Sequence, residues 1–188
     1  MLITSDYRKQ QERMHAEIPG YGVMGAMFGK MVSEIMDRLN ISELLDYGCG
    51  HNLSLFGAIK GSRKFRYQAY DPGVPEYAKD PIPSQMVTCI DVLEHVEPEL
   101  LDDVLDHLQS LTEQVGFFTV HTGPAGKTLP DGRNAHLIQE GAKWWLPKIM
   151  ERFEVQTFQQ IDSGFFVIVY PRIDDGDSDI CRPTDSHQ

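Results

Sequence analysis

The sequence predicts an α/β fold with a mostly parallel central sheet, helices on both faces and an antiparallel hairpin at the C-terminal end. Apolar runs of strand length alternate with segments of helical period, an order typical of strand–helix–strand units. The last two apolar runs, about 153–158 and 165–170, are separated by Asp162-Ser163-Gly164, which suits a hairpin. With 188 residues and no repeat or internal linker, we expect a single domain over 1–173.

The first half of the chain supplies two helices and three strands. Apolar residues at helical spacing over 23–39 predict an amphipathic helix, within an N-terminal helical segment (1–40) that caps the domain. Strands are expected at about 43–47, 65–70 and 86–90, with a helix over roughly 52–60 after the first. The second strand ends at Asp71-Pro72-Gly73, since proline and glycine stop a strand ladder.

The second half of the chain continues the alternation. A helix with a leucine-rich face follows Pro98 and covers 100–111, and a strand is expected at about 115–121. A long loop leads to a helix near 139–151 that we expect to be bent or broken at Pro147. Residues 174–188 carry five aspartates among Gly, Ser, Pro and Thr, a composition that predicts a disordered acidic tail.

Charge and composition disfavour several classes of partner and of site. A formal net charge of -11 without a Lys/Arg cluster disfavours binding to duplex nucleic acid. No apolar run reaches the length of a membrane span, and the N-terminus lacks a secretory pattern, so we expect a cytoplasmic protein. The three cysteines, Cys49, Cys89 and Cys181, are widely separated, and no His/Cys spacing resembles a zinc site. We therefore expect neither a disulfide nor a metal.

Polar residues follow the ends of the expected strands, where ligands bind to open parallel sheets. Gly48 and Gly50 allow the backbone to turn tightly, and the carboxylate of Asp71 is placed to accept two hydrogen bonds from a ribose diol. Leu53 stands where a dinucleotide fingerprint needs its third glycine, and no P-loop lysine follows the strand. The pattern predicts a nucleoside site; the alternative is that the glycines only form a turn and Asp71 only caps one.

Two segments resemble motifs of the class I S-adenosylmethionine-dependent methyltransferases. They are Leu44-Leu45-Asp46-Tyr47-Gly48-Cys49-Gly50 and Cys89-Ile90-Asp91-Val92-Leu93-Glu94-His95-Val96, with the acidic Asp71 at the end of the second strand. The resemblance covers about 41–170 and implies a Rossmann-like fold that binds S-adenosylmethionine and releases S-adenosylhomocysteine.

The resemblance also implies roles for individual residues. Asp46, Tyr47, Gly48, Cys49 and Gly50 would surround the amino-acid half of the cofactor, Asp71 would hold the ribose hydroxyls, and Pro72 and Asp91 would border the adenine or methionine portions. Two features depart from the family pattern: Asn52 stands where a third glycine is common, and the 72–85 segment is too short for a helix and a strand. We therefore expect a rudimentary third strand, which leaves Asp80 as a weak candidate for the adenine edge.

A looser resemblance links the chain to small methyltransferase-like proteins of bacteriophages. It rests on the 123–136 loop, the tryptophan segment after it, and Gln11, His15, Tyr21 and Gly22. It implies a viral origin, and hence the host cytoplasm as the location.

The acceptor side is expected around three histidines and the long loop. His95, His121 and His136 are candidates for a general base, although each is also a common structural polar residue. The 123–136 loop has the length of a lid, with Arg133, Asn134 and His136 as contacts to the substrate. Trp144 and Trp145 either form an aromatic wall behind these residues or pack their helix on the sheet.

Absent motifs narrow the expected function. The chain has no Asp/Asn-Pro-Pro-Tyr/Phe motif for gripping a flipped base, and Thr88 rather than proline precedes Cys89. We therefore expect methyl transfer to a small molecule or a modified base. The alternative is a degenerate S-adenosylmethionine-binding protein that lacks turnover and acts through a protein partner. No pattern indicates an oligomeric state.

Overall fold

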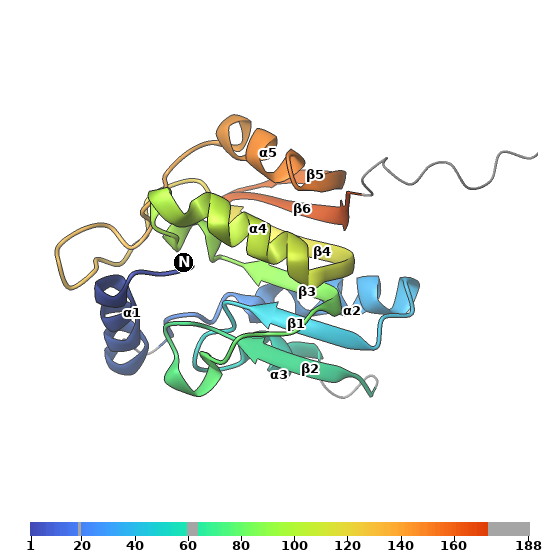
Figure 1. Cartoon of the computed structure of the whole chain (residues 1–188), viewed down its shortest axis with the longest axis horizontal. Helices are drawn as coiled ribbons and strands as arrows, with labels where there is room; N and C mark the ends of the chain where they lie inside the picture. Colours follow the sequence, from blue (N-terminus) through green and yellow to red (C-terminus); the bar gives the residue numbers. More distant parts are fainter. Residues whose placement is uncertain (19, 60–63, 173–188) are drawn as a thin grey trace, which may run out of the picture.

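The computed structural model, described for residues 1–18, 20–59 and 64–172, contains one six-stranded sheet (Figure 1). Its strand order is β2-β1-β3-β4-β6-β5. The strands are β1 (Glu43–Tyr47), β2 (Arg66–Tyr70), β3 (Ser84–Ile90), β4 (Thr112–His121), β5 (Phe153–Ile161) and β6 (Gly164–Pro171). The first four pair in parallel, and β6 is antiparallel to both β4 and β5. The predicted α/β class and C-terminal hairpin are confirmed, while the expected tail at 174–188 lies outside the described residues.

The strand order reverses beside β1, which positions the functional site. The chain moves from β1 to β2 on one side, then returns to place β3 on the other side of β1 and β4 beyond it. The connections leaving the carboxyl ends of β1 and β3 therefore diverge, and a crevice forms between them. The segments that carry Gly48 and Asp91 meet at this point.

Helices cover both faces of the sheet (Figure 1). One core joins α2 (Gly25–Arg38) and α3 (Ser54–Ile59) to the sheet, and the second joins α4 (Leu101–Leu111) and α5 (Ala142–Met150) to the opposite face. Both form because neighbouring strand residues point to opposite faces: Leu44 enters the first core and Leu45 the second. In the described part of the chain, no helix has the length and apolar character needed to cross a membrane.

The N-terminal helix α1 (Ser5–Glu17) lies outside both layers. It begins at Thr4, whose hydroxyl accepts a hydrogen bond from the backbone N–H of Tyr7. Its buried residues Tyr7 and Met14 are two turns apart and pack with Tyr21, Leu129 and Ala135. Helix α1 thus rests on the long loop after β4, at the carboxyl ends of the strands.

Some elements differ from the sequence prediction. The helix α5 runs through Pro147 without a break, so of the two alternatives, a bend or a break, the break is wrong. Strand β4 starts at Thr112 rather than near 115. Its first three residues are polar, so the apolar pattern did not mark them as part of the strand. Residues 71–83, all of them described, form a single 3-10 turn at Pro75–Tyr77 and no strand. The strand β2 is therefore an edge of the sheet.

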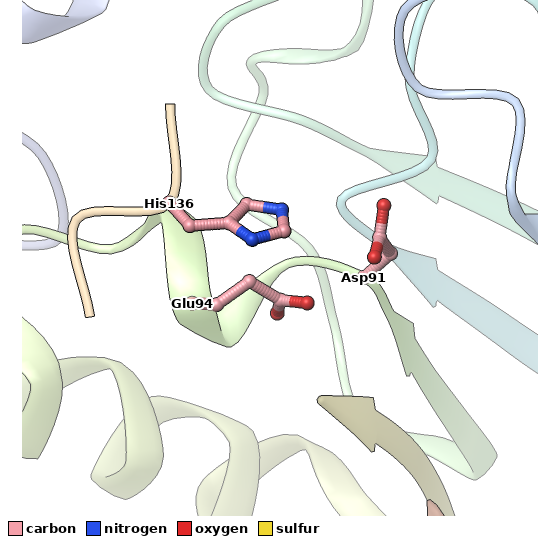
Figure 2. A group of neighbouring side chains, drawn as sticks. All are labelled: Asp91, Glu94 and His136. Carbon is pink, nitrogen blue, oxygen red and sulfur yellow. The ribbon is translucent and has the colours of Figure 1, made fainter. Parts of the chain in front are cut away.

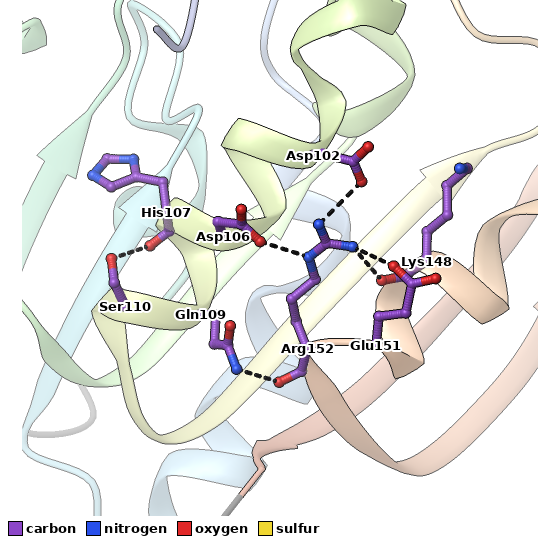
Figure 3. Close-up of polar contacts among 8 residues, drawn as sticks. All are labelled: Asp102, Asp106, His107, Gln109, Ser110, Lys148, Glu151 and Arg152. Carbon is purple, nitrogen blue, oxygen red and sulfur yellow. Dashed lines mark hydrogen bonds and ion pairs between the residues drawn. The ribbon is translucent and has the colours of Figure 1, made fainter. Parts of the chain in front are cut away.

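A polar cluster joins α4 to the turn between α5 and β5 (Figure 3). The guanidinium of Arg152 pairs with Asp106 at 2.7 Å, Asp102 at 3.1 Å and Glu151 at 2.7 Å. The Gln109 side-chain amide donates to the Arg152 carbonyl oxygen at 3.0 Å. Arg152 is well buried while its acidic partners are exposed, so the cluster fixes helix orientation more than it adds stability.

Candidate functional site

A cavity of about 500 Å³ opens at the carboxyl ends of the strands, beside the reversal of strand order. Its lining comes from α1, the 20–24 segment, the ends of β1 to β4, and the loop after β4. Cavities of this size hold cofactors or drug-sized ligands. We call the residues at its two sides the glycine end (Gly48, Asp71 and Gly73 in the lining, with Asp46 and Gly50 behind them) and the histidine end (Asp91, His95, His121 and His136 in the lining, with Glu94 behind them).

The glycines at the end of β1 adopt left-handed backbone conformations. The φ angle is 78° at Gly48 and 64° at Gly50, values that strain any residue with a side chain. A Cβ on Gly50 would lie 2.6 Å from the carbonyl oxygen of Gly22, and one on Gly48 would collide with Val92. The glycine turn is thus required by its own backbone and by close packing of the 20–24 segment.

Asp71 is the central carboxylate of the glycine end. Its Oδ2 accepts the backbone N–H of Gly50 at 3.0 Å, and its Oδ1 accepts that of Gly73 at 2.9 Å. The His15 imidazole lies 3.8 Å from Oδ2, and burial raises the pKa of Asp71. Each carboxylate oxygen keeps a second lone pair, and Asp71 lines the cavity, so it can still accept hydrogen bonds from a ligand.

Of the other residues predicted at the end of β1, Asp46 and Cys49 lie outside the lining of the large cavity. Asp46 is buried and accepts hydrogen bonds from the Tyr67 hydroxyl at 2.6 Å and the Thr88 hydroxyl at 3.1 Å. Burial raises its pKa to about 6. Asp46 and Cys49 line a separate pocket of about 30 Å³, whereas the Tyr47 hydroxyl contacts His107 at 3.1 Å. Of these three, only Tyr47 is among the residues that line the large cavity.

The three predicted histidines come together from distant segments. The ring of His136 lies 4.7 Å, centroid to centroid, from both His95 and His121. All three line the cavity. Burial lowers the pKa of His95 to about 4 and also lowers that of His136. Both rings are therefore neutral near pH 7, and a neutral ring has a lone pair for a proton or a metal.

Glu94 is a member of the histidine end that the sequence analysis did not select. It is fully buried, and its Oε1 accepts the backbone N–H of His121 at 2.6 Å, while its Oε2 has no hydrogen-bond partner. Burial and the neighbouring Asp91 carboxylate raise the pKa of Glu94 well above its usual range. The signal available in the sequence was an acidic residue directly after the apolar pair Val92-Leu93. An acid buried beside apolar residues needs a polar or charged partner.

Asp91, Glu94 and His136 point toward one another (Figure 2). One potential ligand atom from each lies within 4.8 Å of the other two, so the group has the composition and spacing to hold a metal ion. Asp91 has a φ of 60°, a strained value for an aspartate, and its N–H donates to the Thr119 hydroxyl at 3.0 Å. The sequence expectation of no metal considered only His and Cys spacings and overlooked this carboxylate pair.

The remaining predicted substrate residues do not line the cavity. Arg133 is paired with Asp131, and the Asn134 side chain bonds to both backbone polar groups of Ala125, which holds the loop together. Trp145 is fully buried, and its indole donates to the Glu140 carbonyl oxygen; Trp144 packs beside it. Both tryptophans belong to the core under α5, in line with the packing alternative.

Residues near the N-terminus complete the cavity. Gln11, His15, Tyr21 and Gly22 all line it, and the Tyr21 hydroxyl donates to Gln11 at 2.8 Å. The Tyr7 hydroxyl donates to the His95 carbonyl oxygen at 2.7 Å, and Thr4 bonds to Glu97. Helix α1 is thus anchored across both ends of the cavity.

Several solved structures share this fold. An O-methyltransferase family protein from Burkholderia thailandensis is 13% identical with a TM-score of 0.60, over 89% of this chain and 60% of that one. The 1,6-didemethyltoxoflavin-N1-methyltransferase of the same organism, with bound 1,6-didemethyltoxoflavin and S-adenosylhomocysteine, is 14% identical with a TM-score of 0.61, over 91% of both chains. DhpI, in a complex with SAH, is 15% identical with a TM-score of 0.57, over 89% of this chain and 98% of that one.

The likeness at these identities shows a Rossmann-like fold of the class I methyltransferase type. The chain spans less than two thirds of the length of the O-methyltransferase family protein. No protein-family model matches the sequence, and no curated protein sequence matches it either.

Proposed function

We propose that this chain is an S-adenosylmethionine-dependent methyltransferase that acts on a small molecule or a modified base. The observation that carries the proposal is Asp71: a buried carboxylate, fixed by two backbone N–H groups, faces a cavity of about 500 Å³ where the strand order reverses. A carboxylate fixed in this way is suited to accept the two hydroxyls of a ribose. Among the similar structures, the N1-methyltransferase contains bound S-adenosylhomocysteine and DhpI is a complex with SAH. Both support the same cofactor here.

The residues present fit such a cofactor. Asp71 retains free lone pairs toward the cavity, with Pro72 and Gly73 beside it for the nucleoside. Gly48 and Tyr47 line the same cavity as Asp71 and the histidines, so the methionine portion would lie beside them. When bound, the cofactor supplies an electrophilic methyl group on a positively charged sulfur.

The chain's own residues would then orient the acceptor and receive its proton. His136 faces the cavity, and its Nδ1 lies 2.7 Å from the Gly123 carbonyl oxygen, which fixes the ring. Because the oxygen can only accept, Nδ1 carries the hydrogen and Nε2 is left to accept a proton. Helix α1 and the 124–127 segment line the cavity, so they would limit the access of water to a bound acceptor and favour direct attack on the methyl group.

The small cavity and the acidic chain favour a small acceptor over duplex nucleic acid. The toxoflavin precursor bound to one similar structure is a compact molecule, and we infer an acceptor of comparable kind without a specific identity. A bacteriophage origin and a cytoplasmic location remain predictions from the sequence.

One observation favours a second candidate, a cofactor-binding protein without turnover. The 71–83 segment contains no strand, so the edge of the sheet that would flank the adenine is open, and Asn52 replaces a glycine. Such a protein would bind the cofactor and act through a partner.

Two experiments separate these candidates. Calorimetric titration with S-adenosylmethionine, S-adenosylhomocysteine and nicotinamide dinucleotide should show binding of the first two only. Incubation with methyl-labelled S-adenosylmethionine and a metabolite extract should transfer label to a small molecule, with the Asp71→Ala variant as the control. Binding without transfer would favour the second candidate, and absence of binding would refute both.

A further inference from the structure

The histidine end contains a buried carboxylate oxygen that the proposed methyl transfer does not use. Glu94 is fully buried, and the backbone N–H of His121 occupies its Oε1 at 2.6 Å. Its Oε2 has no hydrogen-bond partner, yet it belongs to a side chain that points toward Asp91 and His136 (Figure 2). An unpaired buried carboxylate oxygen is costly, so either a cation or a proton is needed to compensate it.

We propose that Asp91, Glu94 and His136 bind one divalent cation of the Mn²⁺ class, with its open coordination positions facing the cavity. The three ligand atoms lie within 4.8 Å of one another. Ligand atoms about 2.1 Å from an octahedral cation are about 3 Å apart when adjacent and about 4.2 Å when opposite. A small inward movement of the side chains is therefore enough to form the site.

The hydrogen bonds around the three side chains already select the ligand atoms. His136 is oriented by the Gly123 carbonyl oxygen at 2.7 Å from Nδ1, which leaves the lone pair of Nε2 for the cation; with the cation bound, this nitrogen no longer accepts a proton from the acceptor. The His121 N–H engages one oxygen of Glu94 and leaves the other free. Such outer contacts are typical of metal ligands, because they fix tautomer and orientation.

The donor set indicates the type of cation. Two carboxylate oxygens and one imidazole nitrogen suit a first-row divalent ion such as Mn²⁺ better than Mg²⁺ or Ca²⁺, which prefer oxygen ligands alone. The rival occupant is a proton shared between the Asp91 and Glu94 carboxyls. A shared proton needs no nitrogen ligand, so it does not account for the imidazole of His136 in the group.

The site also suggests how an acceptor binds, a point that rests on the proposed function. Asp91 and His136 line the cavity while Glu94 lies behind them, so the positions not filled by protein face the cavity. An acceptor with an oxygen atom could coordinate there. The cation site itself requires no cofactor, so it is tested separately.

The test is a titration of the full chain, stripped with a chelator, with MnCl₂ in the absence of any cofactor. Calorimetry and the loss of the free Mn²⁺ EPR signal should show one saturable site per chain. Glu94→Gln keeps an acceptor for the His121 N–H and should weaken binding at least about tenfold, as should Asp91→Asn. Glu113→Gln, an exposed carboxylate on β4, is the matched control and should bind as the original chain does.

Further readouts keep the proposal falsifiable if a variant unfolds. Thermal unfolding checks each variant, and Asp91→Asn carries the test if Glu94→Gln does not fold, because Asp91 is only half-buried. Pulsed EPR of the bound Mn²⁺ should show coupling to an imidazole nitrogen that disappears in His136→Gln. No saturable binding, or binding unchanged in both carboxylate variants, would overturn the proposal and favour the shared proton. Calorimetry with S-adenosylhomocysteine alone reports separately on the proposed function.

Discussion

The two ends of the cavity are built in different ways. At the glycine end, the key carboxylate receives N–H groups from the turns that follow β1 and β2, within the first two strands of the sheet. At the histidine end, the side chains come from the end of β3, the end of β4 and the far part of the long loop. The first end satisfies its carboxylate with backbone, whereas the second leaves a Glu94 oxygen unpaired.

This difference suggests that the two ends of the cavity have separate roles, one in binding and one in turnover. A preformed end, with its hydrogen bonds already in place, is suited to bind the same ligand in every turnover. An end with an unpaired carboxylate and neutral histidines is suited to a group that arrives with charge, such as a cation or a proton from the acceptor. Changes at the two ends should therefore separate binding from turnover.

The largest expected effect is at the histidine end. His136→Ala should lower kcat by roughly 10²–10⁴-fold, the usual contribution of a general acid–base residue, whether His136 takes the proton or holds a cation. The Kd for S-adenosylhomocysteine should stay within about twofold, because His136 lies away from Asp71. Steady-state kinetics and calorimetry measure the two quantities. A loss of cofactor affinity with unchanged kcat would reverse the proposed roles.

One buried group at each end, His95 and Asp46, should also respond to acid in opposite directions. Burial lowers the pKa of His95 from 6.5 to about 4, so between these values the unfolded chain takes up a proton that the folded chain does not. Its contribution to stability is therefore lost as the pH falls. Burial raises the pKa of Asp46 from 3.8 to about 6, so the folded chain takes up the extra proton and stability rises as the pH falls. Each contribution is about 3 kcal/mol at most.

Denaturant unfolding between pH 7 and pH 4.5 separates these contributions. Proton uptake by folded Asp46 partly offsets the loss of stability in acid. Asp46→Asn removes this offset, so the variant should lose more stability than the original chain over that range. His95→Gln should lose less. Identical pH slopes in all three proteins would show that neither group governs the response.

The next effect is at the glycine end. Asp71→Ala should weaken S-adenosylhomocysteine binding by about 1.5–3 kcal/mol, the scale of hydrogen bonds to a charged group, or roughly 10–150-fold in Kd. The kcat at saturating cofactor should change little if the acceptor lies at the other end. Asp71→Asn, which keeps one oxygen for a backbone N–H, should lose less affinity than Asp71→Ala. Affinity equal to that of the original chain would mean that the cofactor does not bind beside Asp71.

The sequence predicted the glycine end more fully than the histidine end. Gly48, Gly50 and Asp71 lie at strand ends that apolar runs mark clearly, and β1 has the predicted bounds. The group at the histidine end depends on how the loop after β4 returns to the end of β3, which periodicity does not encode. His136 was selected for its residue type, but its neighbour Glu94 was treated only as part of a motif.

Helix α1 shows why some elements escape a search for apolar periodicity. It is mostly polar and buries Tyr7, Gln11 and Met14, a spacing of four and three residues with a glutamine in the middle. The sequence analysis placed a helix only at 23–39 within the N-terminal segment. Arg133 and Asn134 illustrate the converse: polar loop residues were predicted to contact substrate, yet they bond to the loop itself.

A change far from both ends should affect neither of them, and its expected effect is the smallest. The Arg152 cluster joins α4 to the turn after α5, and its acidic partners Asp102, Asp106 and Glu151 are more than 60% exposed (Figure 3). Solvent screens such pairs, so Arg152→Met should reduce the free energy of unfolding by only about 1 kcal/mol. The loss should shrink at high salt, and Arg152→Lys should recover part of it without the forked geometry. Because none of the residues in this cluster lines the cavity, cofactor affinity and Mn²⁺ binding should both stay unchanged; a shift in either would mean that the orientation of α4 controls the histidine end.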